Sequence, residues 1–430
     1  MTAEKVQAAT VHNVTAFTAR MIRCRHAGMN TTDMTATPTG LDFSPVHAAM
    51  QRYVDANILS GVASAVLVGR DLVDVHCVGK ADIENDIALR TDHLFRVFSN
   101  TKLITSCAVL LLWEEARFAL DDPVERFIPQ LGNRRVLRPG ATTLTDTEPA
   151  RSPITIRQLM SHSSGLSYGL LDPGTMMFNA YRGRKVLNAS ATSADTMDTL
   201  AGLPLVFHPG TDWEYSIATD VLARLVEVVS GQRFDGFIQS RIFDPLGMVD
   251  TGFVVPPDQQ HRLAVYYVGA DALDPMKPGL TRRDNFPFHE ANLRAVPQLS
   301  GGGGLVSSLP DMVALMCGLL PGGETLLKPE TIAMMMSNQL PDGVHIRFPG
   351  QGEIRGKGFG LAGAVTLAPS SIDPPQSTRE VQWGGIGGTH WWISPETNLT
   401  GLLMTQRQMA FWHPFSFEFK REVYRAVLER

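Results

Sequence analysis

Three stretches of the sequence carry side chains that could perform nucleophilic chemistry at a carbonyl group. The first is the tetrad Ser99-Asn100-Thr101-Lys102, which has the pattern S-x-x-K and opens the apolar stretch "SNTKLITSCAVLLLWEEARFAL". Helix positions i and i+3 share one face, so Lys102 is predicted to reach the Ser99 hydroxyl. A lysine that apolar neighbours desolvate releases its proton more readily and can act as a base. A serine N-cap beside a solvated lysine is the alternative interpretation.

Two later stretches supply partners for that serine. Tyr215 lies in "HPGTDWEYSIATDVLARLVE", where a turn leads into a helix. A tyrosine hydroxyl near a cationic lysine can take or return a proton. Residues 383–388, "WGGIGG", are predicted to lie in a strand whose glycines let a substrate approach the backbone and leave an N–H free to face an oxyanion. The structural alternatives are that Tyr215 is a half-buried core residue and that the glycines of residues 383–388 form a β-bulge.

A second serine competes for the role of nucleophile. Residues 165–169, "GLSYG", match the G-x-S-x-G pattern of nucleophile elbows, with Ser167 at the centre. An elbow serine needs a buried strand before it and a helix after it, because the sharp turn between them exposes the hydroxyl. The preceding "ITIRQLMSHSSG" instead predicts a helix that ends in a glycine cap at Gly165, and "LLDPGT" after it predicts a turn. Ser167 is therefore predicted not to be the nucleophile.

The composition is that of an ordinary globular protein. Of the 430 residues, 44% are hydrophobic and 19% are charged, which predicts a sizeable buried core. The formal net charge of -5 gives no reason to expect nucleic acid or an anionic membrane as a partner. No apolar run approaches the roughly 18 residues that a membrane span needs. We therefore expect neither a nucleic-acid nor a membrane partner.

The N-terminal segment and the cysteines bear on location. Residues 1–40 show no sustained periodicity and no apolar signal region, so they are predicted to form a poorly ordered arm. Cys24, Cys77, Cys107 and Cys317 lie far apart without CxxC spacing, which argues against a disulfide framework and against a zinc site. The sequence thus predicts a cytoplasmic protein without a recognisable signal peptide, without a metal and without a cofactor.

Hydrophobic periodicity predicts the elements that must position the candidate residues. Residues 44–58 and the closing stretch 417–429 have helical spacing. Residues 61–83 form two β-branched runs split by a short turn, which predicts an antiparallel hairpin. Helical segments separated by Pro and Gly turns fill most of 123–290, and strand patterns return between 359 and 408.

Strands near both ends of the chain, with helices between them, predict an α/β fold. We expect one antiparallel sheet, built from N- and C-terminal parts and flanked by helices. Residues 41–122 and 291–430 would form this sandwich domain, and residues 123–290 would form an inserted, mainly helical domain.

The motifs and the phrases around them, taken in order, resemble the serine β-lactamase and penicillin-binding-protein superfamily. Within it the sequence is similar to the esterase group called family VIII carboxylesterases, which look like class C β-lactamases. The matching phrases extend from about residue 42 to residue 430 and include "LFRVFSNTKLITSCAVLLL", "ITIRQLMSHSSGLSYG", "PGTDWEYS", "SGGGGLVSSLPDM" and "WGGIGGTHWWIS". The resemblance implies a β-lactamase-like antiparallel sheet with an inserted all-helical domain and the site at their junction.

The resemblance also implies a role for each candidate residue. Ser99 would be the acyl nucleophile, and Lys102 and Tyr215 would share the general-base and general-acid work. The backbone N–H groups of Ser99 and Ile386 would form the oxyanion hole. The residues that would line the substrate pocket are Trp383, Gly384, Gly385, Phe98 and His390. Further aromatic candidates for an apolar acyl or alcohol pocket are Trp391, Trp392, Phe286 and Trp412. The alternative interpretations are ordinary core positions for these aromatic residues and a structural role for His390.

Two positions depart from the lactamase pattern. Ile217 and Trp383 stand where lactamases and transpeptidases usually carry the Asn of Tyr-x-Asn and the Lys of Lys-Thr-Gly. Neither can make the charge-assisted hydrogen bond that a buried substrate carboxylate requires, and the loss of one such bond costs about 1.5–3 kcal/mol. The expected function is therefore that of a serine carboxylesterase for small, neutral, short-chain acyl esters, with weak β-lactamase or peptidase activity as an alternative.

Other functions stay open at this point. An acyltransferase of the same superfamily would pass the acyl group to an alcohol or amine instead of water, and the sequence does not separate the two. A non-catalytic binding protein that keeps the fold is the alternative from another class. The presence of Ser99, Lys102 and Tyr215 together argues against it. The expected partner is a small-molecule ester, and assembly into a homo-oligomer is compatible with the sequence.

Overall fold

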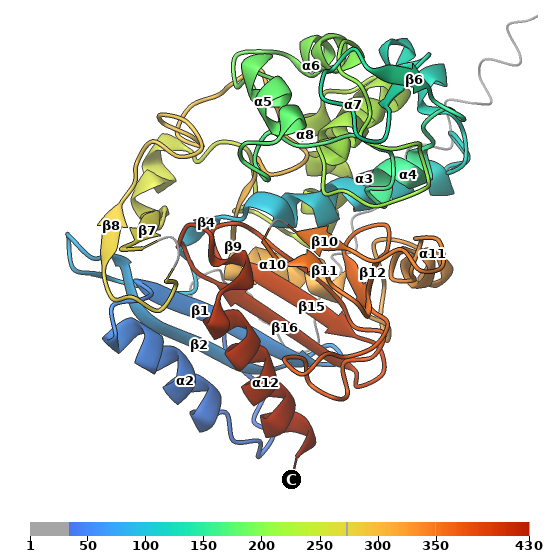
Figure 1. Ribbon diagram of the computed structural model, residues 1–430. Helices are drawn as coiled ribbons and strands as arrows, with labels where there is room; N and C mark the ends of the chain where they lie inside the picture. The colour runs from blue at the N-terminus through green and yellow to red at the C-terminus, as the bar shows by residue number, and fades with distance from the viewer. Residues whose placement is uncertain (1–33, 272–273, 349, 430) are drawn as a thin grey trace, which may run out of the picture.

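An antiparallel sheet of eight strands forms the centre of the described molecule. The computed structural model describes residues 34–271, 274–348 and 350–429 (Figure 1). The strands of the sheet are β1 (Gly61–Val68), β2 (Asp71–Asp82), β3 (Ile87–Ala88), β12 (Lys357–Phe359), β13 (Ala364–Thr366), β14 (Val381–Gly384), β15 (His390–Ser394) and β16 (Leu399–Met404). Their order is β12-β13-β14-β15-β16-β1-β2-β3, and neighbouring strands are antiparallel. The predicted N-terminal hairpin and the C-terminal strands share one sheet because β1 pairs with β16.

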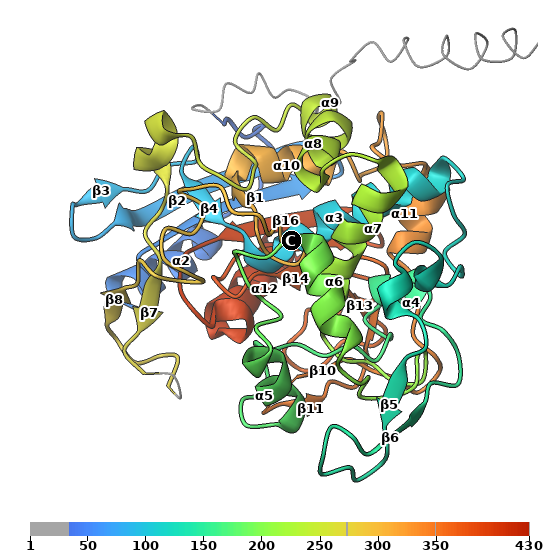
Figure 2. The same cartoon turned by 90° about the horizontal axis from the view of Figure 1, so that it is seen from above.

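Helices cover both faces of this sheet. The helices concerned are α2 (Ser44–Asp55), α3 (Thr101–Glu114), α10 (Leu309–Cys317) and α12 (Pro414–Leu428). α2 and α12 lie side by side on one face, and α10 packs on the other, where α3 separates the sheet from a helical region (Figure 1) (Figure 2). Val62 and Val66 join the core under α2 and α12, whereas Ala63 and Leu67 join the opposite core, because side chains alternate along a strand. The predicted α/β class is confirmed.

The middle of the chain builds a mainly helical region on the α3 side of the sheet (Figure 1). The remaining α-helices are α4 (Ile156–Met160), α5 (Met176–Gly183), α6 (Ser193–Ala201), α7 (Ala218–Ser230), α8 (Phe234–Ile238), α9 (Asp244–Leu246) and α11 (Pro329–Met335). The short strand pairs are β4 (Leu94–Arg96) with β9 (Val306–Ser308), β5 (Arg135–Leu137) with β6 (Thr147–Pro149), β7 (Tyr267–Gly269) with β8 (Leu280–Arg282), and β10 (Arg347–Phe348) with β11 (Gly352–Glu353). α7 packs against α3, α4, α6 and α8. The boundaries expected for an inserted domain at 123–290 stay a prediction. The insertion was expected to be all-helical, but β5 to β8 also lie within residues 123–290. The sequence did not reveal them, because strands of three residues are too short to give an alternating pattern.

Two local expectations about glycine-rich stretches need correction. α4 ends at Met160, not at Gly165, because His162 already adopts a φ of 57° that a helix does not allow. The "WGGIGG" stretch is a strand only as far as Gly384, and the glycines that follow form the turn to β15. Both glycine-rich stretches therefore shape turns.

The expectation about the cysteines also needs correction. Cys317 is disulfide-bonded, whereas Cys77 and Cys107 carry free thiols. Spacing in the sequence did not reveal this bond, because a disulfide depends on distance in space. The arm expected for residues 1–40 lies for the most part outside the described residues. Within the part of the chain that the structure describes, no helix combines the length and the apolar composition that a membrane crossing requires.

The N-terminus of α12 holds a histidine that makes stability depend on pH. Nδ1 of His413 accepts the N–H of Phe415 at 3.4 Å, and its Nε2 lies 2.8 Å from the carbonyl oxygen of Pro275. Burial lowers the pKa of His413 from 6.5 to about 4. The unfolded state therefore takes up a proton at a higher pH than the folded state. This contribution to stability is complete above pH 6.5 and is lost as the pH falls towards 4, by at most about 3 kcal/mol.

Replacing His413 with asparagine tests this pH dependence. Asparagine is a good N-cap acceptor that does not titrate. We expect the free energy of unfolding of His413→Asn, measured by urea denaturation from pH 7 to pH 4, to fall less steeply than that of the wild type. Equal slopes would show that the His413 ring contributes nothing to the acid sensitivity.

Candidate active site

Ser99 lies on a short turn between β4 and α3. The turn is the 3₁₀ helix η1 (Phe98–Asn100), which follows β4 and continues into α3. Gln406, just after β16, holds the turn at its base. Its Oε1 accepts the N–H of Arg96, and its Nε2 donates to the carbonyl oxygen of Arg96, both at 3.1 Å. The sheet thereby fixes the turn, while Ser99 itself stays partly exposed.

Phe98, which precedes Ser99, has an unusual backbone conformation. Its φ of 44° lies in the left-handed region that a bulky residue rarely adopts, so packing must hold it there. Its ring lies next to Tyr266 and Phe286, with centroid distances of 5.4 and 5.8 Å. Phe98 and Phe286, both pocket candidates from the sequence, thus lie in the packing that supports the Ser99 turn. Neither lines the two cavities described below.

Lys102 and Tyr215 meet at the Ser99 hydroxyl. The Tyr215 hydroxyl donates to Ser99 Oγ at 2.7 Å, and Lys102 Nζ lies 3.4 Å from the same oxygen. Lys102 is buried; its Nζ donates to the carbonyl oxygen of Gly302 at 2.6 Å and lies 4.7 Å from the centroid of the Tyr215 ring. A serine hydroxyl with two proton-transfer groups in reach can be activated as a nucleophile. The structure therefore brings these three sequence candidates together.

A glycine loop and a buried carboxyl group hold Lys102 in place. A Cβ atom on Gly302 would lie 2.5 Å from Asp220 Oδ2, so only a glycine lets the backbone come this close to the Asp220 carboxyl group. Asp220, in the first turn of α7, accepts at Oδ1 the Ser300 hydroxyl at 2.7 Å and the Gly302 N–H at 3.4 Å. Burial raises the pKa of Asp220, opposed by the Ser300 hydrogen bond and by the charge of Lys102. Asp220 was not among the residues predicted from the sequence. The feature that could have indicated it is an acidic residue at the start of the helix that follows the Tyr215 motif.

The turn after β14 packs directly against the Ser99 turn. Gly385 allows this contact, because a Cβ atom there would lie 2.5 Å from the carbonyl oxygen of Val97. The Thr389 hydroxyl donates to the same oxygen at 3.1 Å. Among the described residues, the backbone N–H groups of Ser99 and Ile386 find no hydrogen-bond acceptor, and both residues are partly exposed. Two free donors on adjoining turns are what an oxyanion hole requires.

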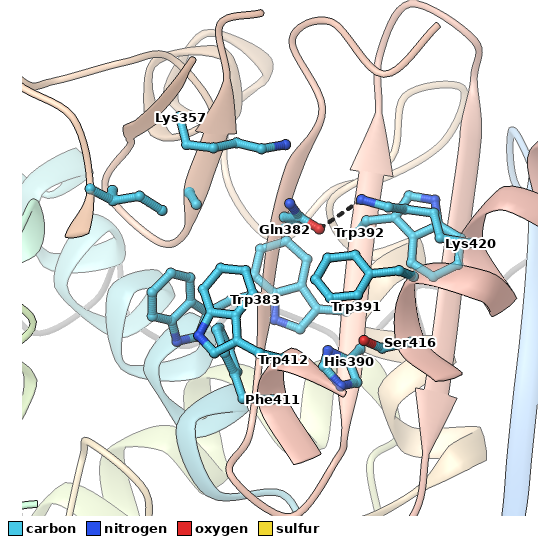
Figure 3. Close-up of a pocket in the computed structure, with 13 residues that line it drawn as sticks. Lys357, Gln382, Trp383, His390, Trp391, Trp392, Phe411, Trp412, Ser416 and Lys420 are labelled. Atoms are coloured by element: carbon cyan, nitrogen blue, oxygen red, sulfur yellow. Dashed lines mark hydrogen bonds between the residues drawn. The ribbon is translucent and has the colours of Figure 1, made fainter. Parts of the chain in front are cut away.

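Trp383 and His390 line a small aromatic cavity between β14, β15 and α12 (Figure 3). Its volume is about 50 Å³, and three further sequence candidates line it, namely Trp391, Trp392 and Trp412. Gly384 lies beneath His390, where a Cβ atom would meet Nδ1 of the ring at 2.6 Å. Burial lowers the pKa of His390 to about 4, and its Nε2 lies 3.3 Å from the carbonyl oxygen of Ala410. His390 is therefore a neutral ring tied to the backbone.

Apolar side chains occupy the two positions where the lactamase pattern has polar groups. Ile217 is fully buried before α7, and Trp383 is 4% exposed. The Trp383 ring lies at centroid distances of 5.2 Å from both Tyr215 and Phe411, and 6.0 Å from Phe348. The side of the site next to Tyr215 is therefore an aromatic wall.

Ser167 lies in a buried loop and not on an elbow. The loop joins α4 to α5, so no strand precedes the serine. Ser167 is 4% exposed, and its hydroxyl donates to Glu214 Oε1 at 2.5 Å. Its hydroxyl is thus occupied by a partner within the protein.

A larger cavity, of about 270 Å³, lies beside Tyr215. It is formed by the loop after α4, the segment before α7 and the β10–β11 hairpin, through residues that include Tyr168, Glu214, Arg347 and Phe348. Tyr215 lines this cavity and its hydroxyl reaches Ser99, whereas Ser99 itself is not among the lining residues. Its walls come from three separate parts of the chain, so no single stretch of sequence predicted it.

Known proteins share this sequence pattern and fold. Residues 46–412 match the protein family described as Beta-lactamase. Esterase EstB from Burkholderia gladioli is 30% identical over 395 residues, which cover 88% of this chain and 94% of EstB. The lovastatin esterase of Penicillium rubens is 32% identical over 333 residues, which cover 72% of this chain and 79% of that protein. The solved structure of EstCE1, described as a hydrolase with promiscuous acyltransferase activity, has a TM-score of 0.75 and 25% identity and covers 88% of this chain and 97% of EstCE1.

These likenesses confirm the resemblance that the ordered motifs indicated, including the likeness to esterases of the family VIII type. They also confirm the β-lactamase-like form of the sheet and its flanking helices. Since the match spans most of the sequence and includes the Ser99, Lys102 and Tyr215 motifs, the chain belongs to the beta-lactamase family.

Proposed function

We propose that this chain is a serine carboxylesterase that hydrolyses small, neutral, short-chain acyl esters through an acyl-enzyme on Ser99. The observation that carries the proposal is the meeting of Tyr215 and Lys102 at Ser99 Oγ, at 2.7 and 3.4 Å. Two relatives are named as esterases and EstCE1 is described as a hydrolase, which supports the same class. A small-molecule ester substrate, a cytoplasmic location and assembly into a homo-oligomer belong to this proposal as expectations from the sequence.

The geometry supports a reaction in two steps. Ser99 Oγ attacks the ester carbonyl carbon while its proton passes to whichever of the pair is deprotonated, the neutral Lys102 amine or the Tyr215 phenolate. The N–H groups of Ser99 and Ile386 would stabilise the resulting oxyanion. When the bond to the alkoxy oxygen breaks, the alcohol leaves with the returned proton. Water then gives a proton to the same pair, attacks the acyl carbon, and releases the acid and the free Ser99 hydroxyl.

The apolar surroundings favour neutral esters. Ile217 and Trp383 offer no partner to a substrate carboxylate, and burying a carboxylate without a partner is unfavourable. Arg347, a cation that lines the larger cavity, is already paired with Asp212 at 2.8 Å. β-Lactams and peptide termini carry a carboxylate, so we expect them to be poor substrates.

Acyl transfer is a second candidate activity for the same site. The cavity of about 270 Å³ beside Tyr215 could hold an alcohol in the place of water, next to the group that would take its proton. EstCE1 combines both activities by its description. The acyl-enzyme is common to hydrolysis and transfer, whereas a binding protein that only keeps the fold would form none.

Product analysis with p-nitrophenyl butyrate tests these alternatives. We expect release of p-nitrophenol with formation of butyrate, and partial formation of a butyrate ester when a small alcohol is added. An organophosphonate should label Ser99, and kcat/KM for a cephalosporin should be at least about tenfold lower than for the ester. No p-nitrophenol release and no label on Ser99 would instead support a binding protein.

A further inference from the structure

The loop that contains the G-x-S-x-G pattern lies beside the segment that carries Tyr215. The carbonyl oxygen of His162 accepts the N–H of Glu214 at 3.1 Å. Nδ1 of the same histidine lies 3.0 Å from the Ser216 hydroxyl oxygen and accepts the Ser216 N–H at 3.3 Å. The residues on either side of Tyr215 are thus bonded to a loop that the reaction itself does not use.

Ser167 bonds to this segment both before and after Tyr215. Its hydroxyl donates to Glu214 Oε1 at 2.5 Å, and its carbonyl oxygen accepts the N–H of Ile217 at 3.2 Å. Its own N–H donates to the hydroxyl oxygen of Tyr181 in α5 at 3.0 Å. A buried residue that is itself anchored therefore bonds to the Glu214 side chain before Tyr215 and to the Ile217 backbone after it.

The other residues of the pattern fit the same arrangement. Gly165 has a φ of 83°, and a Cβ atom there would collide with the carbonyl oxygen of Phe207, so the position requires glycine. The Tyr168 ring packs edge-on against the Tyr215 ring at a centroid distance of 5.7 Å, and Lys102 Nζ lies 5.7 Å from the Tyr168 ring centroid. Tyr168 thus packs against Tyr215, while Gly165 lets the loop pass close to Phe207.

We propose that Ser167 is a positioning residue for Tyr215. Through Glu214 and Ile217, Ser167 holds the Tyr215 hydroxyl within hydrogen-bond reach of Ser99. The proposal rests on the esterase function proposed above. A displacement of about 1 Å would break the 2.7 Å bond between Tyr215 and Ser99, and such a displacement can cost about 100-fold in rate.

The chemistry of Glu214 shows why the Ser167 hydroxyl matters. Burial raises the pKa of Glu214, and the hydrogen bond from Ser167 opposes that rise. Without the hydroxyl, the half-buried carboxylate loses this donor, and a buried acceptor without a partner is unfavourable. Glu214 would then turn towards water in the adjoining cavity, which it already lines, and move its neighbour Tyr215.

A double-mutant cycle with Tyr215→Phe tests the proposal. In the wild-type background we expect Ser167→Ala to lower kcat for p-nitrophenyl butyrate about tenfold, with KM within about twofold. In the Tyr215→Phe background there is no hydroxyl to position, so Ser167→Ala should change kcat by less than about twofold. Equal losses in both backgrounds would overturn the proposal, because Ser167 would then act independently of the Tyr215 hydroxyl.

Ser163→Ala is the matched control. Ser163 is a buried serine of the same loop whose hydroxyl lies 2.9 Å from that of Ser161 and, among the described residues, makes no hydrogen bond to the Tyr215 segment. We expect its kcat to stay within about twofold of the wild type. If thermal melting shows that Ser167→Ala does not fold, Ser167→Cys, similar in size and only a weak donor, takes its place in the cycle. Activity that survives Ser99→Ala would refute the proposed function itself. If Ser99→Ala abolishes activity but Ser167→Ala causes equal losses in the wild-type and Tyr215→Phe backgrounds, only the role of Ser167 is refuted.

Discussion

Replacing Ser99 with alanine is expected to lower kcat for p-nitrophenyl butyrate by about 10⁴-fold or more. The acyl-enzyme needs an oxygen at this position, and no other hydroxyl shares the contacts to both Tyr215 and Lys102 among the described residues. Those two groups would remain, but with no nucleophile to activate. The initial rate of p-nitrophenol release, measured with thermal melting of both proteins, checks the effect.

The fold should tolerate this substitution. The Ser99 side chain contacts Tyr215 and Lys102 on a partly exposed turn, and Gln406 holds the turn through the backbone of Arg96 instead. Ser167→Ala is the comparison, because it removes the serine of the G-x-S-x-G pattern and should cost only about tenfold in kcat. If Ser167→Ala abolished turnover while Ser99→Ala kept it, the assignment of the nucleophile would be wrong.

Replacing Tyr215 with phenylalanine is expected to lower kcat by about 10²- to 10⁴-fold with little change in KM. The change removes only the hydroxyl that lies 2.7 Å from Ser99 Oγ. The ring would keep its packing against Trp383 and Phe348, at centroid distances of 5.2 and 6.0 Å. A loss in kcat alone therefore reports proton transfer rather than the shape of the pocket, and steady-state kinetics at several ester concentrations separate the two.

Tyr168→Phe is the control for that measurement. Tyr168 lies beside Tyr215 and lines the same cavity of about 270 Å³, but its hydroxyl makes no hydrogen bond with Ser99. We expect its kcat to remain within about threefold of the wild type. If both phenylalanine variants lost activity equally, the Tyr215 hydroxyl would have no special part in proton transfer.

The parts of the site that were predictable from sequence are those whose geometry is local. Ser99 and Lys102 are three positions apart at the start of a helix, and a spacing of three places side chains on one face whatever surrounds them. The hairpin of β1 and β2 was predictable for the same reason, because two β-branched runs and the short turn between them specify it within 22 residues. The order of the motifs then placed Tyr215 and Trp383 by resemblance, without showing what either side chain touches.

The predictions that failed concern features that depend on distant parts of the chain. The helix before Gly165 is shorter than expected because the loop after it bonds to the segment around Tyr215, about 50 residues later. The glycines after Gly384 form a turn because they must fit against the Ser99 turn. Spacing in the sequence likewise could not reveal that Cys317 is disulfide-bonded.

By itself, the sequence determined the identity and order of the reactive groups and the α/β pattern that carries them. Only the tertiary structure decided what each group does, because hydrogen bonds and desolvation depend on which residues meet in space. Folding places Gly302 and Asp220 around Lys102, opens a cavity beside Tyr215, and binds the Ser167 hydroxyl to Glu214. A serine in a familiar pattern is therefore buried and bonded, while Ser99, on a strained and partly exposed turn, is the one with two proton-transfer groups in reach.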